Sequence, residues 1–237
     1  ERPRHQHSFT KADGTEGKVR SAGSVVQEQH LPPDRPLVVQ VSRWDALKDH
    51  AGLLTLFAED VGNAEAHLAL VGPDSAGVDD DPEGAAVYAD VLGRYQGLPE
   101  PTRRRVHLVS LPMDDLDENG FMVNAIQRRA DVIVQKSLAE GFGLTVSEGM
   151  WKSRPMVASR AGGIQDQITN EQSGILIDDP ADLPAFARAI DGLLADPLRA
   201  GDLGRNAKQT VKAGLLSVQR LVEHYRLIER LTLRPRP

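Results

Sequence analysis

The sequence contains no cysteine in its 237 residues. A chain without thiols has no disulfide framework, no zinc–thiolate site and no cysteine nucleophile. The chain also lacks any run of about 18 apolar residues, and its first ten residues are too polar for a signal peptide. From these absences we expect a cytoplasmic protein with no membrane span.

Positive charge is not in excess either. The chain has 28 Lys and Arg against 34 Asp and Glu, which gives a formal net charge of -6 with histidine neutral. A protein with this balance has no global positive field to attract phosphate backbones or anionic lipid. We therefore expect no nucleic-acid partner.

Three common active-site patterns are missing as well. The dinucleotide pattern G-x-G-x-x-G, begun by Gly141 and Gly143, would need glycine at the position of Val146. The phosphate-binding pattern G-x-x-x-x-G-K-[ST] and the hydrolase pattern G-x-S-x-G do not occur. The chain thus has no candidate nucleophile for acyl transfer. A dinucleotide-dependent oxidoreductase remains only as an alternative that bound nicotinamide would support.

What the sequence does contain is a regular alternation of two patterns. Short apolar, β-branched runs are typical of buried parallel strands, and apolar residues three and four positions apart are typical of helices. This alternation predicts an α/β fold with a Rossmann-like, doubly wound parallel sheet of about six strands. The strand runs are residues 37–42, 67–71, 106–111, 131–135, 155–159 and 174–177, and the helical segments are residues 53–58, 85–95, 122–129, 144–152 and 183–194.

The ends of the chain differ from this repeat. Residues 1–35 are rich in charge, Gly, Ser and Gln and have no sustained period, so we interpret them as a flexible tail or linker. One domain follows over residues 36–232, and residues 233–237 form a second tail. Two trailing helices, 197–212 and 217–231, are followed by no strand and must pack outside the repeat.

The loop after the fourth predicted strand is the first candidate site, because ligands of open α/β sheets bind beyond the carboxyl ends of the strands. Gly141 and Gly143 allow a ligand to approach the backbone closely. They lead into a helix whose free N–H groups near Leu144 and Thr145 favour a phosphate or diphosphate. The same glycines also fit a simple turn.

Two carboxylates flank this loop, Glu140 and Glu148. A carboxylate beside a phosphate is repelled unless it is directed at another group, and sugar hydroxyls are the obvious one. Glu148, one helical turn beyond Leu144, would accept hydrogen bonds from a ribose diol, and Glu140 from a hexose. The alternatives are a solvated helix residue for Glu148 and a helix N-terminal charge for Glu140.

The loop after the first predicted strand carries two cations, Arg43 and Lys48. Together they would clamp a diphosphate, arginine through a forked contact and lysine as a point charge. Each alone also fits an ordinary surface cation.

Other features are weaker. The acidic residues of segments 79–81 and 115–117 offer carboxylates to a divalent metal, although acidic loops are usually solvated. His107 lies in a strand pattern and fits a core or edge histidine better than a general base. The glycine pair 162–163 fits either a bend or a second close approach to the ligand.

The spacing of Glu140 and Glu148 resembles the E-x7-E motif of retaining GT-B glycosyltransferases of the family-four type. The resemblance spans residues 36–231, and Glu-Gly-Phe-Gly-Leu-Thr matches the donor loop of that family. Arg43 and Lys48 match the Arg and Lys that bind the donor diphosphate there.

Three longer segments are similar to those of the glucosyl-transferring trehalose synthases. The resemblance implies retaining transfer of glucose from a nucleoside diphosphate glucose, such as UDP-glucose, to a sugar hydroxyl, with trehalose as one product. The matching segments are Val-Ser-Arg-Trp-Asp at 41–45, Asp-Asp-Pro-Glu-Gly at 80–84 and Glu-Gly-Phe-Gly-Leu-Thr-Val-Ser-Glu-Gly-Met-Trp-Lys at 140–152.

The resemblance also implies roles for the site residues. Glu140 would position the donor sugar, while Arg43, Lys48 and the helix N-terminus would stabilise the leaving diphosphate without a metal or other cofactor. Glu148 would bind the ribose. The remaining substrate contacts would come from Gly141, Phe142, Gly143, Leu144 and Thr145.

Enzymes of this family have two Rossmann-like domains, and the resemblance covers the C-terminal, donor-binding one. We therefore expect this chain to lack the N-terminal acceptor domain and to be inactive in transfer by itself. The trailing helices after Pro197 should expose an apolar stripe that favours self-association. A nucleotide-sugar-binding module without catalysis is the alternative.

Overall fold

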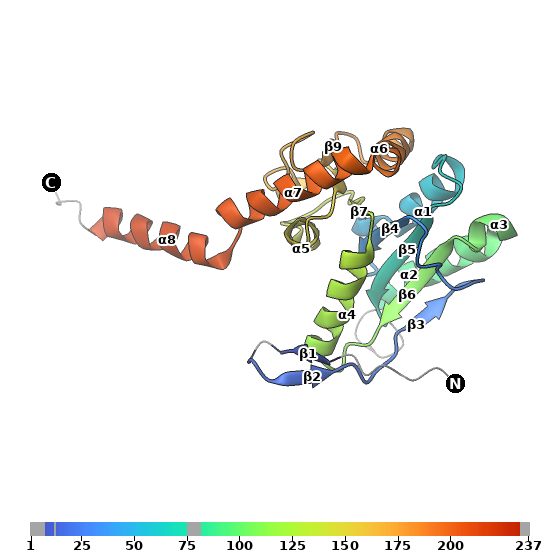
Figure 1. Ribbon diagram of the computed structural model, residues 1–237, viewed down its shortest axis with the longest axis horizontal. Helices are drawn as coiled ribbons and strands as arrows, with labels where there is room; N and C mark the ends of the chain where they lie inside the picture. The colour runs from blue at the N-terminus through green and yellow to red at the C-terminus, as the bar shows by residue number, and fades with distance from the viewer. Residues whose placement is uncertain (1–7, 12, 75–81, 233–237) are drawn as a thin grey trace.

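The computed structural model describes residues 8–11, 13–74 and 82–232 (Figure 1). Its centre is a seven-stranded sheet in which β3 is antiparallel to β6 and all other neighbours are parallel. Each of the predicted strands overlaps an observed one, so the doubly wound parallel sheet is confirmed. In sheet order the strands are β3 (Ser24–Val26), β6 (Val106–Leu111), β5 (His67–Pro73), β4 (Leu37–Val41), β7 (Val132–Gln135), β8 (Met156–Ser159) and β9 (Ile175–Ile177).

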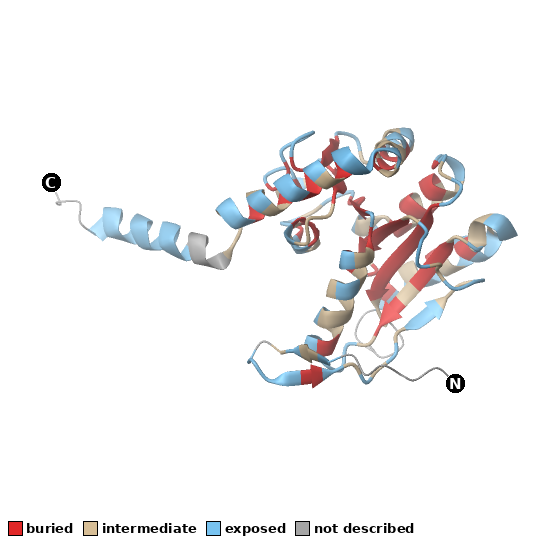
Figure 2. Cartoon of the chain, viewed as in Figure 1, coloured by how far each residue is buried: buried red, intermediate tan, exposed pale blue. Residues whose placement is uncertain are grey.

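Helices cover both faces of the sheet, and the strands between them are largely buried (Figure 2). Side chains of β4 alternate between two apolar clusters, Val38 on the side of α1, α2 and α6, and Leu37, Val39 and Val41 on the side of α4, α5 and α7. The predicted helices are all present. They are α1 (His50–Glu59), α2 (Pro82–Gly97), α4 (Leu116–Arg129), α5 (Leu144–Trp151), α6 (Leu183–Ala195), α7 (Pro197–Gly214) and α8 (Ser217–Thr232), and the short helices η1 (Ala46–Lys48), α3 (Glu100–Arg103) and η3 (Gly162–Ile164) were not predicted.

Chain order reverses at β4. The sheet grows from β4 through β5 to β6 on one side, and from β7 through β8 to β9 on the other. At such a reversal the loops that leave the two central strands diverge and leave room for a ligand at the carboxyl ends. Residues 42–49 after β4 and 136–143 after β7 are these loops.

The segment before Pro36 is not structureless, and the prediction of a tail there is wrong for the part that the structure describes. β1 (Ser8–Thr10) and β2 (Glu16–Lys18) form an antiparallel hairpin, and Phe9 stacks on Phe121 of α4 with ring centroids 4.8 Å apart. Glu118 of α4 accepts the backbone N–H groups of Arg20 and Ser21, each at 2.6 Å. The hairpin itself is local, but the hydrogen bonds that hold this segment to α4 join residues 98 and 97 positions apart.

The two trailing helices behave differently. α7 packs against α5 and α6 and buries Ala200, Leu203, Ala207 and Val211, so the exposed stripe predicted from Pro197 onward is wrong for this helix. α8 projects away from the body, and its described side chains are exposed (Figures 1 and 2). The predicted tail at 233–237 lies outside the described residues. In the described part of the chain, no helix is long and apolar enough to cross a membrane.

Candidate functional site

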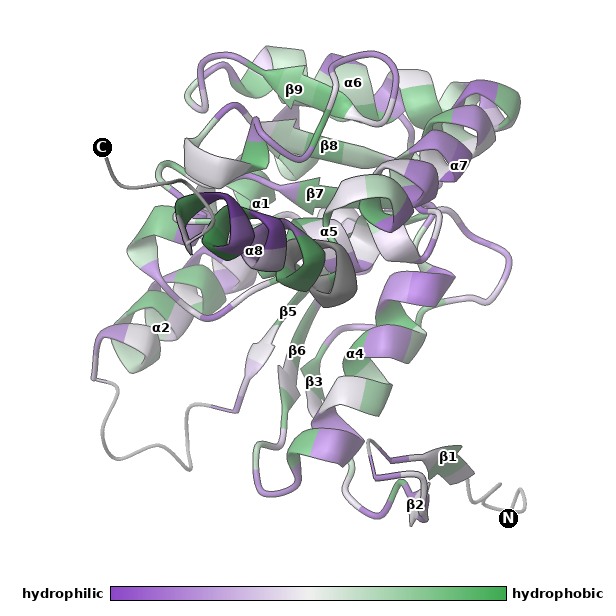
Figure 3. Ribbon diagram, turned by 90° about the vertical axis from the view of Figure 1, so that its left-hand side faces the viewer, coloured by the Kyte–Doolittle hydropathy of each residue, from purple (hydrophilic) through white to green (hydrophobic). Residues whose placement is uncertain are grey.

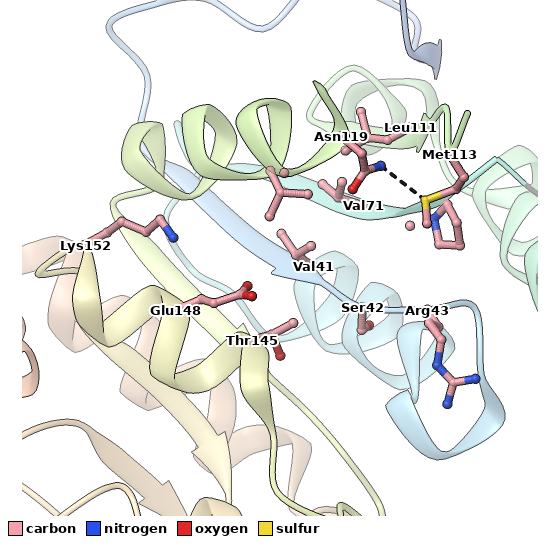
Figure 4. Close-up of a pocket in the computed structure, with 14 residues that line it drawn as sticks. Val41, Ser42, Arg43, Val71, Leu111, Met113, Asn119, Thr145, Glu148 and Lys152 are labelled. Atoms are coloured by element: carbon pink, nitrogen blue, oxygen red, sulfur yellow. Dashed lines mark hydrogen bonds between the residues drawn. The ribbon is translucent and has the colours of Figure 1, made fainter. Parts of the chain in front are cut away.

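A cleft of about 330 Å³ opens at the carboxyl ends of β4, β5 and β6, between α4 and α5 (Figure 4). Its walls are mainly apolar, with Val41, Val71 and Leu111 among the lining side chains. Charged and polar groups lie around this apolar surface: Glu148 points into the cleft from α5, and Arg43 lies at the opposite end (Figure 4). The shape suits a ligand with a flat apolar part and a polar part.

Three of the predicted site residues line this cleft, namely Arg43, Thr145 and Glu148. Glu148 accepts a hydrogen bond from Gln127 Nε2 at 3.3 Å and remains exposed. Lys152 lies one turn further along the same helix, and burial lowers its pKa while the nearby Glu148 carboxylate opposes that shift. Glu148 therefore has carboxylate capacity left for a ligand hydroxyl.

Lys48 and Glu140 form a pair of their own beside the cleft. Lys48 Nζ lies 2.5 Å from Glu140 Oε2, and the two side chains are only 15% and 10% exposed. Glu140 Oε1 also accepts the N–H of Gly141 at 3.1 Å. Because the ion pair is shielded from water, its charges are screened less than those of a surface pair.

Arg43 does not converge with Lys48. Its guanidinium pairs with Asp45 at 3.0 Å, and the side chain is 71% exposed. Asp45 is in turn the N-cap of η1 and accepts the N–H of Leu47 at 2.8 Å. The two cations predicted to act as one clamp thus occupy different surroundings, one shielded and one in solvent.

The N-terminus of α5 has no side-chain cap. Gly143 occupies the N-cap position with φ 84° and ψ 60°, in the left-handed region, where a side chain is strained. Thr145 lies inside the first turn, where its hydroxyl donates to Gln135 Oε1 at 2.9 Å. A helix end of this kind offers backbone N–H groups and a positive partial charge to an anion.

The loop that carries Glu140 rests on the segment after β8. A Cβ on Gly162, whose φ is 47°, would lie 1.6 Å from the carbonyl oxygen of Glu140. Gly163 donates its N–H to the Gly141 carbonyl at 2.9 Å. The glycine pair thus packs against the backbone of residues 140–142, while its close approach to a ligand stays a prediction.

Buried polar residues next to this loop were missed by the sequence reasoning. Gln40, Gln135, Lys136 and Ser137 are each at most 1% exposed. Lys136 Nζ pairs with Asp49 and lies 5.8 Å from the ring centroid of Phe186. The available signal was the polar run 135–137, which begins with the last residue of the otherwise apolar strand β7.

The weaker candidates have structural roles. His107 is buried, with Nε2 2.9 Å from Nδ1 of His67 and Nδ1 2.8 Å from Gln27 Oε1, and burial lowers its pKa to about 4. Asp115 caps α4 by accepting the N–H groups of residues 117 and 118. Within residues 8–11, 13–74 and 82–232 no group of three His, Asp or Glu could hold a metal, and residues 79–81 lie outside this part.

Comparisons with known proteins agree on one group. The family described as Glycosyl transferases group 1 matches residues 118–210. Trehalose synthase of Rubrobacter xylanophilus is 39% identical over 213 residues, which are 89% of this chain and 47% of that protein. The chain spans about half the length of the curated relatives it matches.

Solved structures show the same similarity in three dimensions. Sucrose-phosphate synthase of Thermosynechococcus elongatus has a TM-score of 0.69 and 30% identity, covering 85% of this chain and 47% of that one. Anabaena HepE in complex with UDP-glucose has a TM-score of 0.62 and 18% identity, covering 81% of this chain and 48% of its own. The second likeness is one of fold alone.

Proposed function

We propose, because this chain belongs to the group 1 glycosyltransferases, that its site binds a nucleoside diphosphate glucose for retaining transfer to a sugar acceptor. The observation that carries the proposal is the Lys48–Glu140 pair, 2.5 Å apart, next to the uncapped N-terminus of α5. One loop pair thus offers a cation and N–H donors to a diphosphate and a carboxylate to sugar hydroxyls.

The parts of the donor fit the parts of the site. The nucleoside occupies the cleft, with its base against the apolar wall near Leu111 and its ribose diol on Glu148. The diphosphate lies between Lys48 and the N-terminus of α5, and the hexose lies beside Glu140. Negative charge that develops on the leaving diphosphate is stabilised by Lys48 and the α5 N–H groups, with Arg43 contributing at longer range.

Transfer needs an acceptor held against the donor, and in GT-B enzymes a second domain supplies it. We propose that this chain is the C-terminal, donor-binding half and that it binds donor without catalysing transfer when alone. The names of its relatives contain trehalose, and we propose trehalose as the product of the whole protein.

Titration of the purified chain with UDP-, ADP- and GDP-glucose, with and without Mg²⁺, tests the donor, its base and the metal together. We expect dissociation constants in the micromolar to millimolar range, about −8 to −4 kcal/mol, because one side of the site is open to water. Absence of binding to every donor would rule out the proposal. Trehalose formation from UDP-glucose and glucose by the chain alone would show that no second half is required.

Two variants separate the two carboxylates. Glu148→Gln should weaken UDP and UDP-glucose alike, because both ligands carry the ribose. Glu140→Gln should lower the affinity for UDP-glucose but not the affinity for UDP. The substitution removes the carboxylate that accepts hydrogen bonds from the hexose hydroxyls, and it leaves Lys48 without a competing partner. If both variants bind both ligands as the parent does, neither carboxylate contacts the donor.

A further inference from the structure

Gln40 is a polar side chain in the middle of an apolar strand. It is 0% exposed, and the other residues of β4 are leucine and valine. A buried amide is unfavourable unless both of its ends are hydrogen-bonded. Gln40 Nε2 donates to the carbonyl oxygen of Lys48 at 2.8 Å, and Oε1 accepts the N–H of Lys136 at 2.9 Å. Because a carbonyl only accepts and an N–H only donates, the amide has one possible orientation.

The two partners of Gln40 belong to the two loops of the site. One loop leaves β4 and carries Lys48, and the other leaves the neighbouring strand β7 and carries Glu140. Lys48 ends the short helix η1, so its carbonyl is one that the helix leaves without an internal partner. Among the described residues, Gln40 is the only side chain that hydrogen-bonds to the main chain of both loops.

Other links between the loops are differently placed. Leu138 donates its N–H to the carbonyl of Leu47 at 2.8 Å, and Lys136 pairs with Asp49. Within η1 the N–H of Lys48 donates to the carbonyl of Asp45 at 2.9 Å. None of these bonds engages the carbonyl of Lys48, so the Gln40 amide adds the tie between that carbonyl and the loop of Glu140.

We propose that Gln40 is a positioning residue for the donor site. It acts from below the carboxyl ends of the strands without touching the ligand. Its amide sets the spacing between the loop of Lys48 and the loop of Glu140, and thereby the place where the diphosphate meets its cation. This inference rests on the proposed function. It adds a residue that lies in the core and has no exposed surface to reach a donor.

A double-mutant cycle with Lys48→Ala separates positioning from support of the fold. Gln40→Met keeps the length of the side chain and removes both hydrogen bonds. By calorimetry we expect it to lower the affinity for UDP about tenfold and that for uridine less than about twofold, since misplacement acts on the diphosphate cation. In the Lys48→Ala background the same substitution should lower UDP affinity by less than about twofold, because its effect passes through Lys48.

A control variant separates a loss of stability from a loss of positioning. Val106→Ala, a buried change at the amino end of β6 and so opposite the carboxyl ends that carry both loops, should lower stability and leave UDP affinity unchanged. Equal tenfold losses in both backgrounds, or equal losses for UDP and uridine, would overturn the positioning role and leave the proposed function standing. A parent chain that binds UDP no better than uridine would overturn both. If Gln40→Met does not fold, Gln40→Glu, which keeps an acceptor for Lys136 and loses the donor to Lys48, is held to the same expectations.

Discussion

Lys48 and Arg43 lie on one loop but in different surroundings, and their contributions to anion binding should differ accordingly. Lys48 is 15% exposed and Arg43 is 71% exposed. We expect Lys48→Ala to weaken UDP binding by about 1–3 kcal/mol, because it removes a shielded charge from a phosphate. Arg43→Ala should cost less than about 1 kcal/mol, because water and salt screen an exposed charge.

Isothermal titration with UDP and with uridine measures both effects. Arg94→Ala on α2, which removes an exposed arginine from the pair with Asp90, serves as the control for loss of one positive charge. A larger loss for Arg43→Ala than for Lys48→Ala, or an equal loss for UDP and uridine, would contradict this ranking.

Two buried histidines make stability depend on pH. Burial lowers the pKa of His50 and of His107 to about 4, whereas an unfolded histidine titrates near 6.5, as a rough value. Between about pH 6.5 and 4 the unfolded chain binds more protons than the folded one. The free energy of unfolding should therefore fall as pH drops through this window. Above the window the contribution of the two neutral histidines to stability is complete.

Urea denaturation at several pH values between 7.5 and 5 checks this dependence. His50→Leu should flatten it, because the variant removes one group whose pKa differs between the two states. His224→Gln, a change at an exposed histidine of α8, should leave the slope as in the parent. A His50→Leu slope equal to that of the parent would show that His50 does not contribute.

At the scale of elements, the loop of Glu140 depends on the segment after β8. We expect Gly162→Ala to destabilise the protein and to weaken UDP-glucose binding more than UDP binding, because the new Cβ would lie 1.6 Å from the Glu140 carbonyl and must displace the loop. The left-handed φ of 47° adds about 1–2 kcal/mol of strain. Gly97→Ala at the end of α2 is the matched control, since its Cβ meets nothing within 4 Å and it lies outside both loops of the site.

Thermal unfolding and calorimetry of these two glycine variants provide the measurement. Similar melting temperatures and similar donor affinities for Gly162→Ala and Gly97→Ala would mean that the loop does not rest on Gly162.

Sequence patterns predicted the elements that are defined by local periodicity, and they missed what depends on partners. Strands such as β4 and β7 are apolar runs, and α5 follows a glycine-rich loop. The two strands and the helix could therefore be located from the sequence. The two carboxylates and two cations could be named, but not their pairing, because the Lys48–Glu140 contact joins residues 92 positions apart. The role of Gln40 could not be predicted from its place in the apolar run 37–42, since its two bonds become visible only when β4 and β7 are adjacent.

At the scale of the whole molecule, α8 is an amphipathic helix whose apolar side is exposed to solvent. Leu221, Tyr225 and Ile228 follow one another at helical spacing and are 71%, 66% and 60% exposed, and Figure 3 shows apolar and polar sides on this helix. Exposed apolar stripes of this kind favour association. We expect the chain to form dimers or larger species in sedimentation velocity as protein concentration rises.

Leu221→Asp combined with Ile228→Asp should return the chain to a monomer without loss of the folded body, because α8 makes few contacts with the rest. Arg226→Asp, a charge change on the other side of α8, serves as the control and should preserve association. Monomeric parent protein at every concentration tested would show that the stripe does not drive association.

The short strand β3 has a consequence for how the chain must be shortened. It covers residues 108–110 of β6, the strand that would otherwise form one margin of the sheet, while β9 at the opposite margin has only three residues. An uncovered strand offers a row of unpaired N–H and C=O groups to other molecules, and long uncovered strands template fibrils. A version that starts at Pro36 should therefore bind thioflavin T on standing and give the 4.7 Å cross-β reflection. The same version with Val109→Lys, which puts a charge on the bared strand, should stay in solution.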